Sequence, residues 1–463
     1  MDGVKSLSQR CLYTLLIIIC ISYQTCSLNH NRKGKDAFDP SLEIPITEVE
    51  NSNASDSIVI KAVDIPEELV TYEGSQVWRV VEGTEEKKEY VSYLQETGEV
   101  STWMGNGSAV DVLVRPNMIP QVSRFLRERH INFDVIIPDV QQAIDQENPP
   151  LPPELIDELE GRAGHRMEWT TYHRLEDIHG YLDYLAQTFP QICSVMSIGT
   201  SVEGRSLKVI RITNNKPGTP AIWIDGGIHA REWISPASVT YIINYLVDNS
   251  ETLEAEYYIL PVVNPDGYEY TFRGDRLWRK NRNNPEKGGV CIGVDLNRNY
   301  GYRWGGLGTS KQPCREIFAG TGPFSEPETN AIKNFFEASA ANFKAYLSFH
   351  SYGQYILYPW GYDRRVPPDY SDLDRVGQKA AVAMKAIGGN DYTVGNSAST
   401  LYAAAGGSDD WAKAIHKIKY TYTIELQDRG RYGFVLPARY IIPTAMEALE
   451  AVKVITEASI MKE

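Results

Sequence analysis

The chain has 463 residues, of which 42% are hydrophobic and 23% charged, and its formal net charge at pH 7 is −14. The length favours more than one domain, and the hydrophobic fraction is sufficient for a packed core, so the protein is of the globular class. Residues 28–166 carry 26 acidic and 13 basic side chains, which account for nearly all of the net charge. This excess argues against nucleic acid as a partner and suggests a detachable acidic segment.

Residues 1–27 predict a signal peptide. Lys5 and Arg10 form its positive n-region, residues 11–23 form an apolar h-region, and residues 25–27 are small enough for cleavage. The apolar run is too short to favour a membrane span, although an uncleaved signal anchor is the alternative. We therefore expect a secreted, extracellular protein with no membrane partner.

Residues 28–65 are polar with few aromatic side chains, and they predict a flexible N-terminal tail. The tail contains the sequence NAS at Asn53, and a second pattern of this kind, NGS, begins at Asn106. Both patterns are acceptors for N-linked glycosylation where they are exposed.

Three of the six cysteines lie in the leader, which leaves Cys193, Cys291 and Cys314. An odd number in a secreted chain predicts one disulfide plus a free thiol, or an intermolecular bond. We expect Cys291 to pair with Cys314, because both lie in one polar, glycine-rich segment. Cys193 lies in an apolar stretch and is expected to be a buried core thiol.

A compact domain is predicted over residues 66–145. Strand and helix patterns follow one another there in the order β-α-β-β-α-β, which is the split βαβ unit of a ferredoxin-like α+β sandwich. The patterns are, in chain order, SQVWRVV, TEEKKEYVSYLQET, VSTWMG, AVDVLVRP, IPQVSRFLRERH and NFDVIIP.

Residues 146–166 read as a connecting segment with a proline-rich break and an acidic, helix-like run. Arg162 and Arg166 flank a glycine at its end. Exposed arginines in a loop are suitable sites for a trypsin-like protease, so we expect cleavage there. A linker that is never cut is the alternative.

Residues 167–463 contain apolar strand patterns separated by helical segments, such as AIWIDGG, FKAYLSFH and YTYTIEL. Buried strands that alternate with helices predict an α/β fold, here an α/β/α sandwich around a mixed, largely buried sheet.

Polar side chains collect at the ends of these strands. In GGIHAREWIS, His229 and Glu232 stand three residues apart directly after a buried strand, and His350 ends another strand. Imidazole and carboxylate are both good zinc ligands, and a catalytic zinc site needs three protein ligands and an open position. A chance surface pair and a structural histidine are the alternative readings.

The motifs together resemble those of the zinc metallocarboxypeptidases of the pancreatic digestive type, in their zymogen form. The similarity covers nearly the whole chain after the leader, and the N-terminal sandwich resembles the family's activation domain. The motifs, in order, are GGIHAREWIS, VNPDGY, RLWRKNR, GVDLNRNY, SFHSYGQ, YAAAGGSDDW and ELQDRGRYGF. The resemblance implies a zinc exopeptidase, made as an inactive precursor, that acts on the C-termini of peptides and proteins.

The resemblance also implies a role for each residue. One Zn²⁺ ion would be held by His229, Glu232 and His350, with Asp295 fixing the ring of His229. Glu425 would be the general base and then the proton donor to the leaving amine.

Arg279 would stabilise the tetrahedral intermediate as a fixed cationic donor. The residues that would bind the substrate are Arg231, Asn297, Arg298, Tyr352, Tyr402 and Asp409. Among these, Asn297, Arg298 and Tyr402 would hold the free C-terminal carboxylate.

Asp409 indicates which type of C-terminal residue the enzyme removes. Relatives that remove basic residues have an aspartate at this place, and relatives that remove apolar residues have an aliphatic one. A buried carboxylate replaces the lost hydration of a Lys or Arg head group, so we predict B-type specificity for C-terminal Lys and Arg. The alternatives are A-type specificity, or a role of Asp409 and Asp410 as a solvated pair or helix cap; Asp410 is expected to be structural.

Two rival functions are a homologue that binds but has lost catalysis, and an amidohydrolase on the same scaffold. The presence of all three ligands and Glu425 disfavours the first, and the zymogen segment and the carboxylate clamp disfavour the second. Gln427 departs from the arginine of many relatives at a non-catalytic position. We expect a monomer whose acidic N-terminal domain covers the arginine-lined cleft by charge complementarity.

Overall fold

The computed structural model describes residues 69–162, 164–285 and 288–461. The predicted signal peptide, the predicted tail and Asn53 lie outside the described residues. Among the helices that are described, none combines the length and the hydropathy needed to cross a bilayer.

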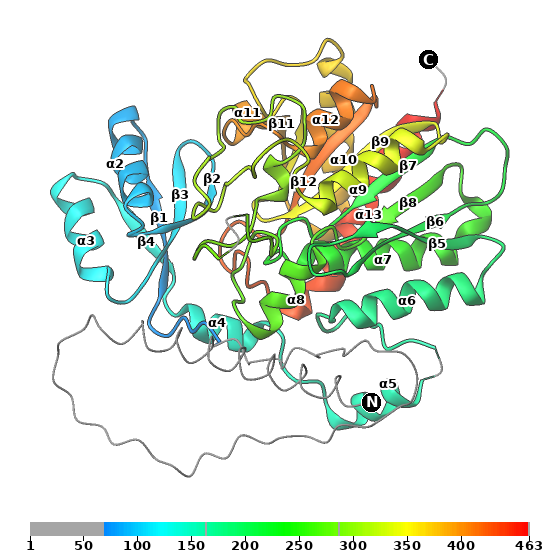
Figure 1. The fold of residues 1–463 in the computed structure, drawn as a ribbon, viewed down its shortest axis with the longest axis horizontal. Helices are drawn as coiled ribbons and strands as arrows, with labels where there is room; N and C mark the ends of the chain where they lie inside the picture. Colours follow the sequence, from blue (N-terminus) through cyan, green and yellow to red (C-terminus); the bar gives the residue numbers. More distant parts are fainter. Residues whose placement is uncertain (1–68, 163, 286–287, 462–463) are drawn as a thin grey trace, which may run out of the picture. The chain divides into compact units, whose positions relative to one another are not determined.

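The first part of the described chain is a four-stranded antiparallel sheet with two helices, and the ferredoxin-like prediction is confirmed (Figure 1). The strand order is β2-β3-β1-β4. Val80 and Val112 are buried on the face that packs against Val122 and Leu126 of the second helix. The elements are β1 (Gln76–Val81), α2 (Glu85–Glu96), β2 (Ser101–Gly105), β3 (Ala109–Val114), α3 (Ile119–Glu128) and β4 (Phe133–Ile137).

Two helices follow this sheet, α4 (Val140–Glu147) and α5 (Pro153–Gly161). The side chain of Asp139 caps α4 by accepting a hydrogen bond from the backbone N–H of Gln142 at 3.0 Å. Helix α4 therefore runs across the predicted domain boundary at residue 145. Arg162 and Arg166, the predicted cleavage positions, are both exposed.

The larger part of the chain is built on an eight-stranded sheet with the order β11-β10-β12-β9-β7-β8-β6-β5. The sheet is mixed, because its central pairs β12–β9, β9–β7 and β7–β8 are parallel, whereas β5–β6, β6–β8 and β10–β12 are antiparallel. The strands are β5 (Cys193–Thr200), β6 (Ser206–Ile212), β7 (Ala221–Asp225), β8 (Glu256–Leu260), β9 (Phe343–Ser351), β10 (Tyr355–Tyr358), β11 (Thr393–Asn396) and β12 (Tyr420–Leu426).

Helices cover both faces of this sheet (Figure 1). Successive side chains of a strand point to opposite faces, so Ile222 and Ile224 of β7 join the core under α6, α7, α10 and α13, whereas Trp223 joins the core under α9 and α12. The predicted α/β/α sandwich is confirmed. The helices are α6 (Leu175–Thr188), α7 (Ile234–Asp248), α8 (Pro265–Arg273), α9 (Pro327–Ala338), α10 (Tyr370–Gly388), α11 (Ser397–Thr400), α12 (Ser408–Ile415) and α13 (Ile441–Ile460), with 3₁₀ turns η1 (Ser250–Thr252), η2 (Leu296–Arg298) and η3 (Ala438–Tyr440).

The cysteine predictions are also confirmed. Cys291 and Cys314 form a disulfide, and Cys193 on β5 is a free thiol with 3% of its surface exposed.

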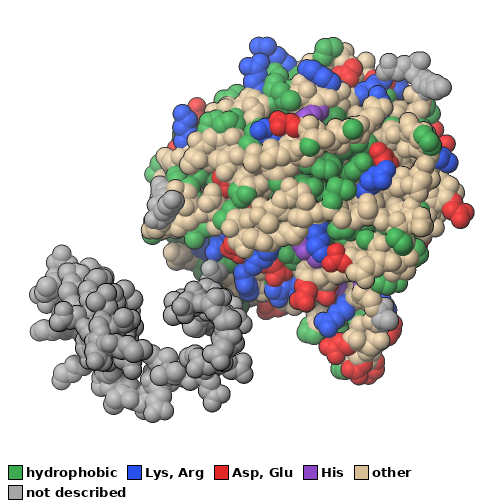
Figure 2. Space-filling view, turned by 45° about the vertical axis from the view of Figure 1, so that its right-hand side comes forward, with side chains coloured by type: hydrophobic (Ala, Val, Ile, Leu, Met, Phe, Trp, Pro, Cys, Tyr) green, Lys and Arg blue, Asp and Glu red, His purple; other side chains and the backbone are tan. Residues whose placement is uncertain are grey.

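On the surface, basic and acidic side chains are interspersed among hydrophobic ones over the face drawn in Figure 2.

Candidate active site

The loop between β7 and α7 carries His229 and Glu232, and it is tied to the neighbouring strand. Gly227 has a φ of 62°, a left-handed conformation that favours glycine. Its backbone N–H donates to Ser235 Oγ at 3.0 Å, and Ser235 Oγ donates to the carbonyl of Phe349 at 2.6 Å. Because Phe349 lies on β9, this serine fixes the loop against the strand that carries the second histidine.

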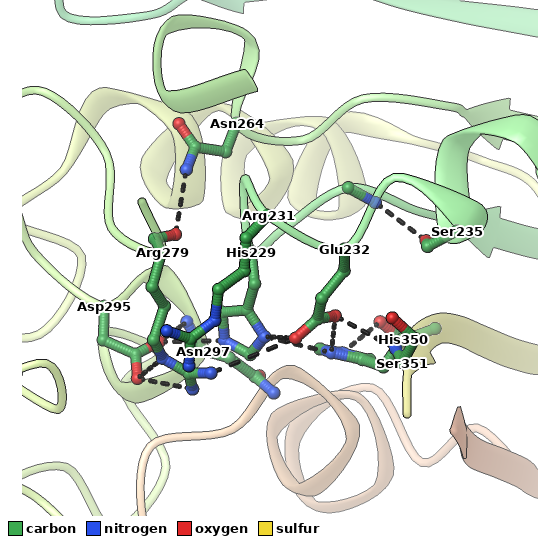
Figure 3. A network of polar contacts seen from close by, with 12 residues as sticks. His229, Arg231, Glu232, Ser235, Asn264, Arg279, Asp295, Asn297, His350 and Ser351 are labelled. Carbon is green, nitrogen blue, oxygen red and sulfur yellow. Dashed lines mark hydrogen bonds and ion pairs between the residues drawn. The ribbon is translucent and has the colours of Figure 1, made fainter. Parts of the chain in front are cut away.

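His229, Glu232 and His350 converge at one buried point (Figure 3). Glu232 places one carboxylate oxygen 2.8 Å from Nδ1 of His229 and the other 3.1 Å from Nδ1 of His350. The two Nδ1 atoms are 3.2 Å apart. A ligand atom from each residue lies within 4.8 Å of the others, so the three can hold one metal ion.

The outer ring nitrogens of both histidines are already engaged. Nε2 of His229 lies 3.1 Å from Asp295 Oδ1, and Nε2 of His350 lies 3.2 Å from Ser348 Oγ. Ser348 donates its only proton to Asp225 at 2.6 Å, so it accepts from His350. Each Nε2 therefore carries the proton, and both Nδ1 lone pairs face Glu232. This donor set fits zinc.

Sequence reasoning found Asp295 but missed Ser348 and Asp225. The signal for Ser348 is its position two residues before His350, because alternate residues of a strand share a face. Asp225 is the last residue of β7, directly before the two glycines of the loop.

The electrostatics of the three residues favour a bound cation. Burial alone would raise the pKa of Glu232, but His229 and His350 together lower it below its usual range. Burial opposes a charge on His350, yet Glu232 raises the pKa of that histidine to about 9. The carboxylate therefore attracts positive charge to this point, as a proton or as a metal ion.

Glu425 lies beside the three residues because of strand pairing. Strands β9 and β12 are parallel, and their register places Glu425 opposite His350. Burial raises the pKa of Glu425 to about 8, and its Oε2 atom is buried without a hydrogen-bond partner among the described residues. The carboxyl group is therefore able to take up and release a proton near neutral pH.

Arg279 is held on the other side of His229 (Figure 3). Its Nη2 atom donates to Asp295 at 2.8 Å, and its Nη1 atom lies 4.0 Å from Glu232. The backbone of this segment is fixed by Asn264, whose Nδ2 atom donates to the carbonyl of Lys280 at 3.0 Å. Asp295 thus positions both the ring of His229 and the guanidinium.

Asn297, Arg298 and Tyr402 line the same pocket as the histidines. Arg298 donates to the carbonyls of Gly308 at 2.9 Å and Asn297 at 3.0 Å, and its Nη2 atom makes no hydrogen bond within residues 69–162, 164–285 and 288–461. Tyr402 follows α11 and is 46% exposed. A free guanidinium nitrogen is thus available for an incoming carboxylate.

The neighbouring residues Asp409 and Asp410 differ, and of the two only Asp409 lines the pocket. Asp410 accepts hydrogen bonds from the backbone N–H groups of Gly361 at 2.8 Å and Tyr362 at 2.9 Å. Asp409 is 5% exposed, accepts only from backbone N–H groups nearby, and forms no ion pair with any described residue. Burial raises its pKa.

Asp409 lines the same pocket as the histidines. Smaller and apolar side chains complete that pocket beside it, namely Leu357, Gly361, Ser397, Leu401, Ala404, Gly407 and Thr423.

The N-terminal domain reaches this pocket through strand β2. Trp103 and Met104 line it, and the indole of Trp103 lies 6.4 Å from the ring of Tyr352 between centroids. The hydroxyl of Tyr352 donates to Asp111 of β3 at 2.8 Å. Arg231 lies nearby, with its guanidinium 4.1 Å above the ring of Phe434.

The expected charge complementarity is wrong. Within the described residues, Arg231, Arg279 and Arg298 form no ion pair with the N-terminal domain. Arg231 lies 3.4 Å from Glu316, and Arg279 and Arg298 lie 2.8 Å and 3.9 Å from Asp295. Asp111 is itself paired with Arg79 of β1 at 2.7 Å. The side chains of the N-terminal domain that line the pocket are the apolar Trp103 and Met104, so its contact with the pocket wall does not depend on these arginines.

A buried ion pair joins helix α4 to the larger part of the chain. Glu147 of α4 accepts from Nε of Arg276 at 2.7 Å, and both side chains are buried. Arg276 also donates to the carbonyls of Arg231 at 2.9 Å and Phe434 at 2.8 Å.

Comparison with known proteins accounts for this geometry. The family model described as "Zinc carboxypeptidase" matches residues 178–451, and the model described as "Carboxypeptidase activation peptide" matches residues 78–147.

Individual relatives carry the names of both specificity types. The chain is 49% identical over 296 residues to carboxypeptidase B of Astacus astacus, covering 62% of this chain and 97% of that protein. It is 37% identical over 397 residues to carboxypeptidase A1 of Bos taurus, covering 83% and 93%. The crystal structure of thrombin activatable fibrinolysis inhibitor (TAFI) aligns with a TM-score of 0.75 at 34% identity, covering 84% of this chain and 99% of that one. The chain therefore belongs to the zinc carboxypeptidase family and is a procarboxypeptidase of the pancreatic type, with an activation peptide ahead of its catalytic domain.

Proposed function

We propose that the activated enzyme removes Lys and Arg from the C-termini of peptides and proteins. The observation that carries this proposal is Asp409, a buried carboxylate in the substrate pocket with no cationic partner among the described residues. A Lys or Arg head group in a closed pocket loses its hydration, and a carboxylate replaces it. An apolar side chain would leave that carboxylate buried and unpaired, which costs free energy.

Three residues anchor the end of the substrate chain in this proposal. Arg298 offers its free Nη2 atom to the terminal carboxylate, Asn297 offers its side-chain amide, and Tyr402 closes over the bound residue from its exposed loop. Recognition of the carboxylate restricts the enzyme to chain ends. Arg231 and Tyr352 contact the peptide further upstream.

The chemistry assigns a proton-transfer role to Glu425. Zinc held by His229, Glu232 and His350 supplies Lewis-acid chemistry, which lowers the pKa of water and polarises a carbonyl. Glu425 takes a proton from the attacking water and then gives it to the leaving amine. Arg279, fixed by Asp295, stabilises the negative oxygen of the tetrahedral intermediate.

The precursor is proposed to be secreted, monomeric and inactive until a trypsin-like protease cuts at Arg162 or Arg166. Apolar cover of the pocket by Trp103 and Met104 supports this autoinhibition. Release of the activation segment would uncover Tyr352 and the pocket together.

The test compares trypsin-activated enzyme on peptide pairs that differ only in a C-terminal Arg or Phe, with and without a chelator. Arg should be strongly preferred, and the chelator should abolish both activities. Asp409→Ile should reverse the preference without loss of zinc, and the isosteric Asp409→Asn should weaken it by removing the charge alone. Equal rates on the two peptides for the unmutated enzyme would leave A-type specificity in its place.

A further inference from the structure

The sequence Asn106-Gly107-Ser108 forms the tip of the hairpin between β2 and β3. All three residues are exposed. Gly107 has a φ of 77°, which allows the tight turn. The acceptor pattern for N-linked glycosylation thus stands on a surface loop, where an enzyme can reach it.

The two groups that define the pattern contact each other at this tip. Asn106 Oδ1 accepts hydrogen bonds from Ser108 Oγ at 2.8 Å and from the backbone N–H groups of Ser108 at 3.2 Å and Ala109 at 3.0 Å. These contacts use only the oxygen of the carboxamide. Nδ2 of Asn106 makes no hydrogen bond with any described residue, so the nitrogen that would be modified is free.

The space directly around Gly107 is open. An added Cβ on Gly107 would have only the carbonyl of Leu401 within 4 Å, at an ordinary contact distance of 3.8 Å. The hairpin tip therefore lies beside the loop that carries Tyr402, with no close contact at Gly107.

We infer that Asn106 carries an N-linked oligosaccharide in the secreted precursor. The donor is a lipid-linked oligosaccharide diphosphate: the bond between sugar C1 and the diphosphate oxygen breaks, a bond between C1 and Nδ2 forms, Nδ2 loses one proton, and the lipid diphosphate leaves. The modification requires entry into the secretory pathway, which the leader predicts, and is independent of the substrate preference.

The sugar is confined to the part of the chain that is removed. Residues 167–463 contain no Asn-X-Ser or Asn-X-Thr pattern, whereas Asn53 and Asn106 both precede the predicted cleavage sites. On this proposal the precursor carries N-linked sugar and the activated enzyme does not. A hydrophilic group at the hairpin tip would also shield this exposed turn from proteases, so that cutting is directed to the connecting segment.

The test uses the full-length precursor secreted from eukaryotic cells and treated with peptide N-glycosidase in ¹⁸O-water. We expect ¹⁸O-labelled aspartate at position 106 and a mass shift of the activation segment but not of the trypsin-activated enzyme. Asn106→Gln and Ser108→Ala should each remove the oligosaccharide at this site, Ser108→Thr should retain it, and Asn53→Gln should leave it unchanged. Recovery of the Asn106 peptide wholly unmodified from secreted, trypsin-activatable precursor would overturn the inference.

Discussion

The Glu147–Arg276 pair should hold the activation segment closed, and Glu147→Ala tests this directly. Arg276 is 5% exposed and stacks 3.7 Å above the ring of Trp233. Removal of one partner from a buried ion pair leaves an uncompensated charge and costs about 3–5 kcal/mol. Since about 1.4 kcal/mol is a factor of ten in an equilibrium constant, the closed state would lose a factor of roughly 10² to several times 10³.

The assay is the peptidase activity of the uncut precursor at about pH 8. Burial raises the pKa of Glu147 to about 7, although Arg276 lowers it. The pH must therefore lie above about 7, so that the carboxylate is ionised and the ion pair is present. The uncut Glu147→Ala precursor should be more active than the unmutated one by up to about 10³-fold, the factor by which the closed state is weakened. Glu160→Ala is the matched control, because it removes an exposed carboxylate of α5.

After trypsin treatment, all three proteins should have equal activity, because residues 147 and 160 leave with the activation segment. Glu147→Leu combined with Arg276→Met should restore low activity to the uncut precursor, since an apolar pair carries no unpaired charge. If the uncut Glu147→Ala and Glu160→Ala precursors are equally inactive, the ion pair does not hold the segment closed.

Three further changes test the site and the fold. Glu425→Gln should lower turnover by about 10²-fold or more while zinc content, measured by atomic absorption, is retained; a fall in zinc content would make Glu425 a structural support instead. Ser348→Ala should weaken zinc binding by about 10- to 100-fold in competition with a chelator, because the ring of His350 loses its acceptor, whereas Ser351→Ala, which removes a hydroxyl without a partner in the described structure, should not. Burial lowers the pKa of His179 from 6.5 to about 4, so its contribution to stability is present above pH 6.5 and lost as the pH falls towards 4. His179→Gln should therefore reduce the loss of thermal stability between about pH 7 and about pH 4.5, by about 2 kcal/mol; equal losses in both proteins would contradict this.

The sequence predicted the elements that have a strong periodic pattern. Strand β7 is a nearly continuous apolar run and strand β12 alternates aromatic or aliphatic residues with Thr and Glu, and both patterns indicate strands. Helix α4 was missed because its eight residues follow directly from β4 and lie in a segment that reads as the start of the linker. Local pattern carries no information about such a boundary, which is set by packing.

The site shows the same limit. The motifs located His229, Glu232 and His350, but the contact of Ser348 with His350 and Asp225 depends on how β9 pairs with β7. The contact between the N-terminal domain and the pocket could not be predicted from net charge, because Arg231 and Arg279 form ion pairs within the larger part of the chain. Pairing between distant segments appears only in the folded structure.

The parallel pairing of β9 with β12 separates the proposed reactive groups from the groups proposed to select the substrate. His350 and Glu425 are neighbours across two strands, so their spacing is set by backbone hydrogen bonds, about 4.8 Å from strand to strand. Asp409 and Tyr402, by contrast, lie on α12 and on the loop that precedes it. Substitutions in that loop and helix can therefore change which residue is accepted while the distance between the proton-transfer group and the metal ligand stays constant. Members of such a family can therefore differ in substrate preference while the same residues carry out the reaction.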